Sequence, residues 1–93
     1  MRFLTSYARV LLALAHTPAL SVTGLAAVCG TSERTVQRII AELVRAGFLT
    51  READGRRVRL GVRHEAAACH PCEGRLSVRS LLRLVRAGTG EET

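Results

Sequence analysis

The sequence has 93 residues, of which 47% are hydrophobic and only three are aromatic, so one small, mainly helical domain with an aliphatic core is expected. The formal net charge is +6 and all 14 basic residues are arginine. This charge favours an anionic partner, although a bias toward G+C-rich codons also explains the missing lysines. No apolar run approaches the roughly 18 to 20 residues that cross a bilayer. With no secretory signal and an odd number of cysteines, we expect a cytoplasmic chain with reduced thiols and no membrane partner.

The first predicted helix begins after Thr5 or Ser6, either of which can cap it, and carries apolar residues at helical spacing. It should end before Pro18, because the residue that precedes a proline avoids the α region. The apolar stripe, which we expect to be core, comprises Tyr7, Val10, Leu11 and Leu14.

A second, short helix is predicted after Ser21 or Thr23, with Leu25 and Val28 on its buried side. Gly30 suits the left-handed position that closes a helix, because glycine adopts it at little steric cost. The chain is therefore expected to turn sharply at Cys29-Gly30-Thr31, and Cys29 should be a small buried residue of that turn.

A third helix is predicted over residues 32–46, with Ser32 as its cap, Glu33 in its first turn and Gly47 as its stop. The helical period separates an apolar face from a polar one. The apolar face carries Val36, Ile39, Ile40, Leu43 and Val44, and the opposite face carries Arg34, Gln37, Arg38, Ala41 and Arg45.

Two strands are predicted over residues 48–52 and 57–62, on either side of Asp54-Gly55, a strong hairpin signal. In the second strand apolar and basic residues alternate, so one sheet face should be apolar and the other basic. The apolar residues are Val58, Leu60 and Val62, and those between them are Arg57, Arg59, Gly61 and Arg63.

The remaining chain is predicted to hold a connecting loop over residues 64–74, because Pro71 argues against a regular helix, and a last amphipathic helix over 75–88. Residues 89–93 should be a disordered tail. The apolar stripe of the last helix either forms a dimer contact, which would stabilise so small a domain, or packs within the chain. Its residues are Val78, Leu81, Leu82 and Val85.

The order of these elements predicts a mainly α structure with a small antiparallel β-hairpin, an α+β winged helix-turn-helix over residues 1–63 with a C-terminal amphipathic helix. A helix face that carries arginine and glutamine is often only a solvated surface. Here it follows a glycine turn and leads into a basic hairpin, and residues 31–63 hold eight arginines against four acidic residues. This combination favours binding to duplex DNA.

In this interpretation the helix over 32–46 enters the major groove, and the hairpin over 48–62, the wing, lies on the backbone or in the adjacent minor groove. On the helix, Arg34, Gln37 and Arg38 are expected to contact bases or phosphates, while Ser32 and Thr35 can bond to a phosphate at the helix N-terminus. On the wing, the expected contacts are Arg56, Arg57 and Arg59.

The run from Leu25 to Leu49, LAAVCGTSERTVQRIIAELVRAGFL, resembles the core of MarR-type winged-helix regulators of transcription. With ARVLLALA before it and DGRR after it, the chain is similar to small bacterial MarR-like proteins over roughly residues 5–63. The resemblance implies a homodimer that binds DNA. Full-length members have longer flanking helices that form the dimer and a ligand pocket, whereas these segments are minimal here, so no effector is assigned.

Cys69 and Cys72 form a C-x-x-C pair, with His64 nearby. An inert loop, a redox switch and a metal site are all chemically possible, since thiolate and imidazole ligate zinc and two nearby thiols can oxidise. A closed zinc site needs four ligands, however, and no second C-x-x-C is present. We therefore predict no metal and no cofactor.

The predicted function is a sequence-specific, double-stranded DNA-binding regulator of transcription. The alternative is a winged helix that acts as a protein-interaction or assembly module without an operator of its own. An enzyme is not expected, because the sequence has no paired carboxylates, no glycine-rich phosphate loop and no nucleophile with a matching base.

Overall fold

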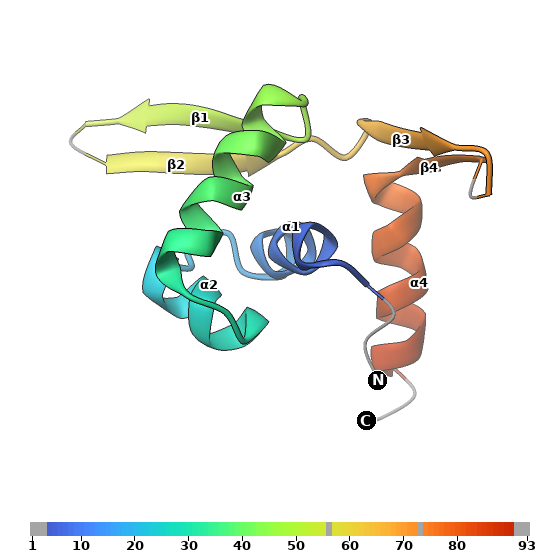
Figure 1. The fold of residues 1–93 in the computed structure, drawn as a ribbon, viewed down its shortest axis with the longest axis horizontal. Helices are drawn as coiled ribbons and strands as arrows, with labels where there is room; N and C mark the ends of the chain where they lie inside the picture. Colours follow the sequence, from blue (N-terminus) through green and yellow to red (C-terminus); the bar gives the residue numbers. More distant parts are fainter. Residues whose placement is uncertain (1–3, 56, 73, 91–93) are drawn as a thin grey trace.

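The computed structural model describes residues 4–55, 57–72 and 74–90 and is a mixed α+β fold. In Figure 1, helix α1 lies between the α2–α3 pair on one side and α4 on the other, and two small antiparallel hairpins lie along one edge. The elements are α1 (Ser6–His16), α2 (Val22–Cys29), α3 (Glu33–Arg45), β1 (Leu49–Asp54), β2 (Arg57–Val62), β3 (Ala67–His70), β4 (Gly74–Ser77) and α4 (Val78–Gly90).

The first three helices begin at polar caps, as the sequence predicts. The side-chain oxygens of Thr5, Ser21 and Ser32 each accept a hydrogen bond from a backbone N–H in the first turn. Such a bond satisfies one of the amide groups that have no partner inside the helix. The donor–acceptor distances to the amides of Ala8, Gly24 and Thr35 are 3.3, 3.0 and 3.1 Å.

Two glycines end the helices of the central helix-turn-helix. Gly30 closes α2 with φ of 68°, and Gly47 follows α3 with φ of 88°. After α3, the Gly47 amide bonds to the Val44 carbonyl and the Phe48 amide to the Leu43 carbonyl, at 3.1 and 2.9 Å. This pair of bonds is the Schellman arrangement, which satisfies the last carbonyls of a helix and requires a left-handed residue.

The core lies where α1, α2, α3 and the first hairpin meet, and aliphatic side chains fill it. Two residues that were predicted to be core are exposed instead, Val28 at 66% and Tyr7 at 38%. The inward face of α2 instead comprises Leu25, Ala26 and Cys29, since the fourth residue after Leu25 lies closer to its direction than the third. The largest fully buried side chains are Val10, Leu14, Leu25, Val36, Ile39 and Leu49.

A second hairpin replaces most of the predicted connecting loop over 64–74. Strands β3 and β4 pair from Ala67 opposite Ser77 to His70 opposite Gly74. The prediction was wrong because β3 has no β-branched or aromatic residue to signal a strand. Pro71 lies in the turn between the strands, where its fixed φ is tolerated and no ladder hydrogen bond is lost.

Helix α4 is displaced along the sequence from its predicted range of 75–88. Residues 75–77 belong to β4, and the helix extends to Gly90, so residues 89 and 90 are helical and not part of a disordered tail; residues 91–93 lie outside the described chain. The start is set by Ser77, whose hydroxyl oxygen accepts the Ser80 amide at 3.2 Å.

The apolar stripe of α4 packs largely within the chain. Val78 and Leu82 are each 3% exposed and belong to the core, and Leu81 and Val85 are partly buried against it. An ion pair between Arg79 and Glu65 adds to the junction with the preceding segment. None of the helices in the described residues has the length and hydrophobicity that a membrane span requires.

Candidate nucleic-acid interface

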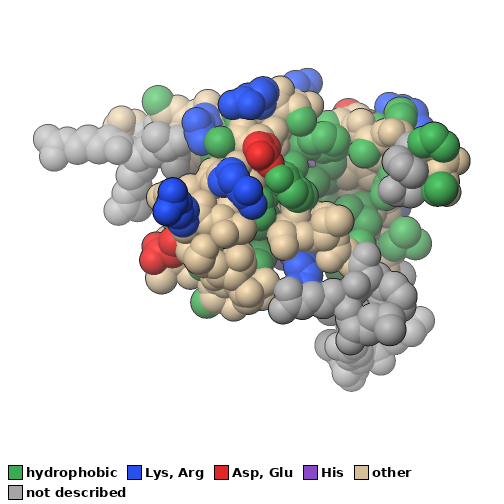
Figure 2. All heavy atoms as spheres, in the orientation of Figure 1, with side chains coloured by type: hydrophobic (Ala, Val, Ile, Leu, Met, Phe, Trp, Pro, Cys, Tyr) green, Lys and Arg blue, Asp and Glu red, His purple; other side chains and the backbone are tan. Residues whose placement is uncertain are grey.

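The outer face of α3 is polar, exposed and positively charged. Arg34, Gln37 and Arg38 are all exposed, while Val36, Ile39 and Ile40 on the opposite face are buried. Figure 2 shows arginine side chains gathered over this helix, on the side turned toward the viewer. Within the described part of the chain, the side chains of these three polar residues make no hydrogen bond or ion pair. Their donors therefore remain available for a ligand.

The beginning of α3 is fixed by two hydroxyl groups. Ser32 accepts the Thr35 amide, and its own hydroxyl donates to Thr35 Oγ1 at 2.9 Å. As the acceptor in that bond, Thr35 keeps its hydroxyl hydrogen available to donate. The Ser32 side chain is thus committed to the cap, and Thr35 is the hydroxyl better able to bond to a phosphate.

Helix α3 is also tied to both neighbouring helices through its carboxylates. The Thr23 hydroxyl of α2 donates to Glu33 Oε1 at 2.9 Å, across the glycine turn. On the other side, the Tyr7 hydroxyl of α1 donates to Glu42 Oε2. This bond, together with a smaller effect of burial, raises the pKa of Tyr7 above its usual 10.0. These contacts connect α3 to α1 and to α2.

The register of the first hairpin assigns its arginines to different faces. Arg51 stands opposite Leu60, on the same sheet face as Leu49, which is buried against the core. Arg59 stands opposite Glu52 on the other sheet face. The backbone of Arg57 pairs with that of Asp54 beside the turn, and Arg56 lies outside the described residues. In the register of β2, positions 57 and 59 therefore share one sheet face, and Arg51 lies on the opposite face.

Arg51 is a candidate that the sequence analysis missed. It lines a groove of about 210 Å³ together with Gln37 of α3, and the remaining lining residues are Val22, Ile40 and Leu60. Its place two residues after the buried Leu49 is the signal that could have found it, because alternate residues of a strand share a face. The structure thus brings together a residue of the wing and one from the polar face of α3.

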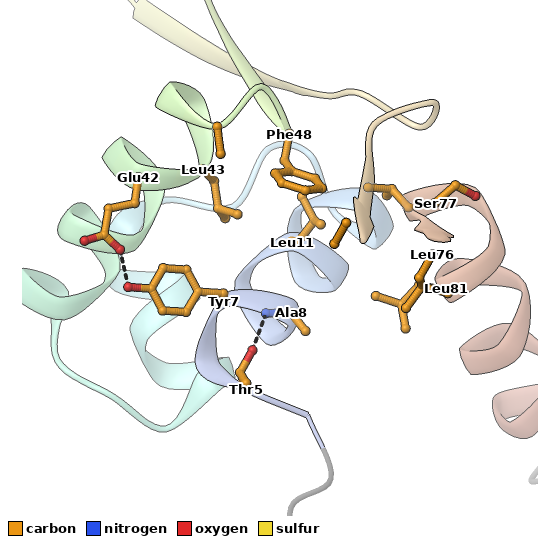
Figure 3. Close-up of a pocket in the computed structure, with 13 residues that line it drawn as sticks. Thr5, Tyr7, Ala8, Leu11, Glu42, Leu43, Phe48, Leu76, Ser77 and Leu81 are labelled. Atoms are coloured by element: carbon orange, nitrogen blue, oxygen red, sulfur yellow. Dashed lines mark hydrogen bonds between the residues drawn. The ribbon is translucent and has the colours of Figure 1, made fainter. Parts of the chain in front are cut away.

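An open apolar pocket of about 420 Å³ lies behind α3, between α1, the second hairpin and α4. In Figure 3 the bonded pair Tyr7 and Glu42 lies at one side of this pocket, and Leu76 and Leu81 lie at the other. Polar groups are few, so the surface is mainly aliphatic and aromatic. Residues of α1, the second hairpin and α4 therefore line an open pocket next to the helix-turn-helix.

The three cysteines lie in different environments. Cys29 is buried in the core, and burial raises the pKa of its thiol, as fits a small packing residue. Cys69 on β3 and Cys72 in the following turn are exposed. Across the described residues, no three His, Cys, Asp or Glu side chains come together as a metal site would require. His64 instead lines a groove with Pro18 and Arg59.

The comparison with protein families agrees with this geometry. The MarR family model matches residues 4–59, which is more than half of the chain and extends from the start of α1 into β2. The second hairpin and α4 lie outside the match. Comparisons with curated proteins and with solved structures found no match. MarR proteins are DNA-binding regulators of transcription with a winged-helix fold. By the extent of its match, this chain belongs to the MarR family.

Proposed function

We propose that this chain is a sequence-specific regulator of transcription that binds duplex DNA. Helix α3, over residues 32–46 with its cap, enters the major groove, and the wing over 48–62 lies on the backbone or in the adjacent minor groove. The observation that carries the proposal is the outer face of α3, where Arg34, Gln37 and Arg38 are exposed and make no hydrogen bond or ion pair with other described residues.

The chemistry of these residues fits the edges of base pairs. A guanidinium can donate two hydrogen bonds to guanine O6 and N7, and a glutamine amide can pair with adenine N6 and N7. Each good bidentate contact is worth about 1 to 3 kcal/mol of discrimination against the wrong base. Arg34 and Arg38 are one helical turn apart, and Gln37 lies beside them, so the three can contact neighbouring base pairs.

The same proposal includes a homodimer in the cytoplasm of a bacterium. Two-fold symmetry then places two copies of α3 about one DNA turn apart, so half-sites separated by about 10 base pairs are expected. Of the four α4 residues predicted as dimer contacts, Val78 and Leu82 are already covered within one chain. Leu81 and Val85 keep part of their surface, and Leu84 is 69% exposed. The face of α4 that carries Leu81, Leu84 and Val85 is therefore the proposed contact.

The proposal is tested by titrating a labelled duplex of mixed sequence with the wild-type chain and two single variants. Arg38→Ala removes a charge from the outer face of α3, and Arg83→Ala removes an equal charge from another exposed face of α4, outside the proposed dimer contact. We expect the first variant to bind more weakly with a flatter salt dependence, and the second to bind like wild type. Equal binding by wild type and Arg38→Ala would instead favour the protein-interaction module.

A further inference from the structure

Arg51 occupies a place that none of the predicted wing contacts has, directly beside the polar face of α3. From it we infer that the groove between α3 and β1 is a binding site for a backbone phosphate of duplex DNA, with Arg51 as its cationic ligand. The inference rests on the proposed function and adds a specific contact to it: Arg51 holds the DNA strand that passes between the recognition helix and the wing.

The position of the groove follows from the pairing of the strands. Leu49, Arg51 and Ala53 are alternate residues of β1 and share one sheet face. They pair with Val62, Leu60 and Val58 of β2, respectively. Leu49 packs under α3 at 2% exposure, so the face that carries Arg51 is the face turned toward that helix. Arg51 lies one step farther along the strand and is exposed. Arg51 therefore lies at the boundary between the buried and the solvent-exposed part of this sheet face.

The described residues that line the groove are uncharged, except for Arg51. Val22, Ile40 and Leu60 are apolar, and Gln37 contributes a neutral amide, so of the described residues that line the groove Arg51 alone is charged. No carboxylate competes for the guanidinium there, and Arg51 makes no hydrogen bond or ion pair with another described residue. Apolar walls also exclude part of the water that would otherwise screen the charge.

The size and donors of the groove suit a phosphodiester. Its volume of about 210 Å³ has room for a phosphate group together with a few waters, each of which takes about 30 Å³ in the liquid. A guanidinium donates two parallel hydrogen bonds to phosphate oxygens, which is the strong geometry for this pair. The Gln37 amide at the same groove can donate to the phosphate or to a base edge next to it.

Arg59 provides an internal comparison, because it carries the same charge on the same hairpin. It stands opposite Glu52 on the other sheet face and lines a different groove with Leu14 and Pro18, beside the end of α1. Arg59 also interacts with other residues of the chain. The two arginines differ in the direction they face, and only Arg51 shares a groove with the polar side of α3.

The test is the salt dependence of binding to labelled duplexes of mixed sequence, measured by fluorescence anisotropy for wild type, Arg51→Ala, Arg51→Gln and Arg83→Ala, which removes an exposed charge of α4. One lost phosphate contact lowers the slope of log K against log salt by about 0.9 per bound chain, which is roughly an eight-fold loss of affinity at 0.1 M salt. We expect both Arg51 variants to show this loss on every duplex sequence, and Arg83→Ala to lose less than half as much in slope. Circular dichroism melting curves identify any variant that does not fold, and the glutamine variant keeps most of the packing stem.

The outcomes separate this inference from the proposed function. If Arg38→Ala weakens binding but both Arg51 variants bind like wild type, the phosphate site is wrong and the regulator proposal stands. An equal loss of slope for Arg51→Ala and Arg83→Ala overturns the site, because net charge alone then explains the effect. A loss for Arg51 variants on some duplex sequences but not others also overturns it, since a base contact is then indicated. Wild type that binds no duplex overturns both proposals.

Discussion

The hydroxyl of Tyr7 in α1 donates a hydrogen bond to the carboxylate of Glu42 in α3, and this bond lies between the open apolar pocket and the arginine-bearing side of the molecule. It connects the first turn of the chain to the helix that we propose enters the major groove. Because Tyr7 is the only tyrosine and the chain has no tryptophan, its ionisation can be followed without interference.

The first prediction concerns that ionisation. The hydrogen bond to Glu42 holds the pKa of Tyr7 above 10.0, so ultraviolet difference absorbance of the folded chain should show a titration midpoint above that value. Glu42→Ala removes both the acceptor and its charge, and the midpoint should fall toward 10. An unchanged midpoint in Glu42→Ala would show that the two side chains are not bonded in solution.

The same pKa shift predicts how stability changes in alkaline solution. Since the folded-state pKa of Tyr7 is raised, its stabilising effect is fully present below pH 10 and is lost as the pH rises through the folded-state value. Urea unfolding curves at pH 9 and above 10 should therefore show a larger loss for wild type than for Tyr7→Phe, which has no ionisable hydroxyl. Parallel losses in the two proteins would contradict the assignment.

Another prediction compares two residues of α2. Leu25 is fully buried and Val28 is 66% exposed, so Leu25→Ala should lower the free energy of unfolding by about 2 to 5 kcal/mol while Val28→Ala changes it by less than about 0.5 kcal/mol. Urea denaturation followed by circular dichroism measures both. Similar losses for the two variants would mean that α2 is rotated relative to the structure.

The next prediction concerns Ser32, the cap of α3. Ser32→Ala removes the acceptor of the Thr35 amide and should cost about 1 kcal/mol of stability, whereas Ser32→Gly should cost only a few tenths of that relative to serine. Chemical denaturation of the three proteins gives the comparison. If the alanine variant is as stable as wild type, the cap bond does not form in solution.

The dimer can be tested on α4. Leu84 is 69% exposed on this helix, so Leu84→Asp should leave the fold intact but convert a dimer to a monomer in analytical ultracentrifugation. Arg83→Ala, at the adjacent exposed position, is the control and should sediment like wild type. A wild type that sediments as a monomer at all concentrations, or a Leu84→Asp variant that remains a dimer, would remove this contact.

Much of the helix-turn-helix could be predicted because local chemistry and the hydrophobic period agree there. Ser21 and Ser32 cap the helices that the sequence assigns to them, Gly30 and Gly47 end them, and Asp54-Gly55 marks the first hairpin. The second hairpin could not be predicted, because half of its first strand is alanine and none of it is β-branched, while backbone hydrogen bonds from the start of α4 to residues 64 and 66 help to place it.

The candidate interface was predictable on α3 but not on the wing. The regular helical spacing of apolar residues in α3 predicts that its opposite face is exposed, and this face carries Arg34, Gln37 and Arg38. On the wing, the high number of arginines predicted contacts at Arg56, Arg57 and Arg59. The pairing register and the groove lining instead place Arg51 beside Gln37 of α3. The direction that each arginine faces depends on how the hairpin packs under α3, and this packing cannot be predicted from the amino-acid composition.

The most direct test of the central claim is selection of bound sequences from a random duplex library by wild type and by Gln37→Ala. We expect wild type to enrich a motif with two half-sites about 10 base pairs apart, and Gln37→Ala to show a relaxed preference at one position of each half-site. Selection that enriches no motif with wild type, while the folded protein is present in excess, would contradict a regulator that recognises DNA sequence through α3.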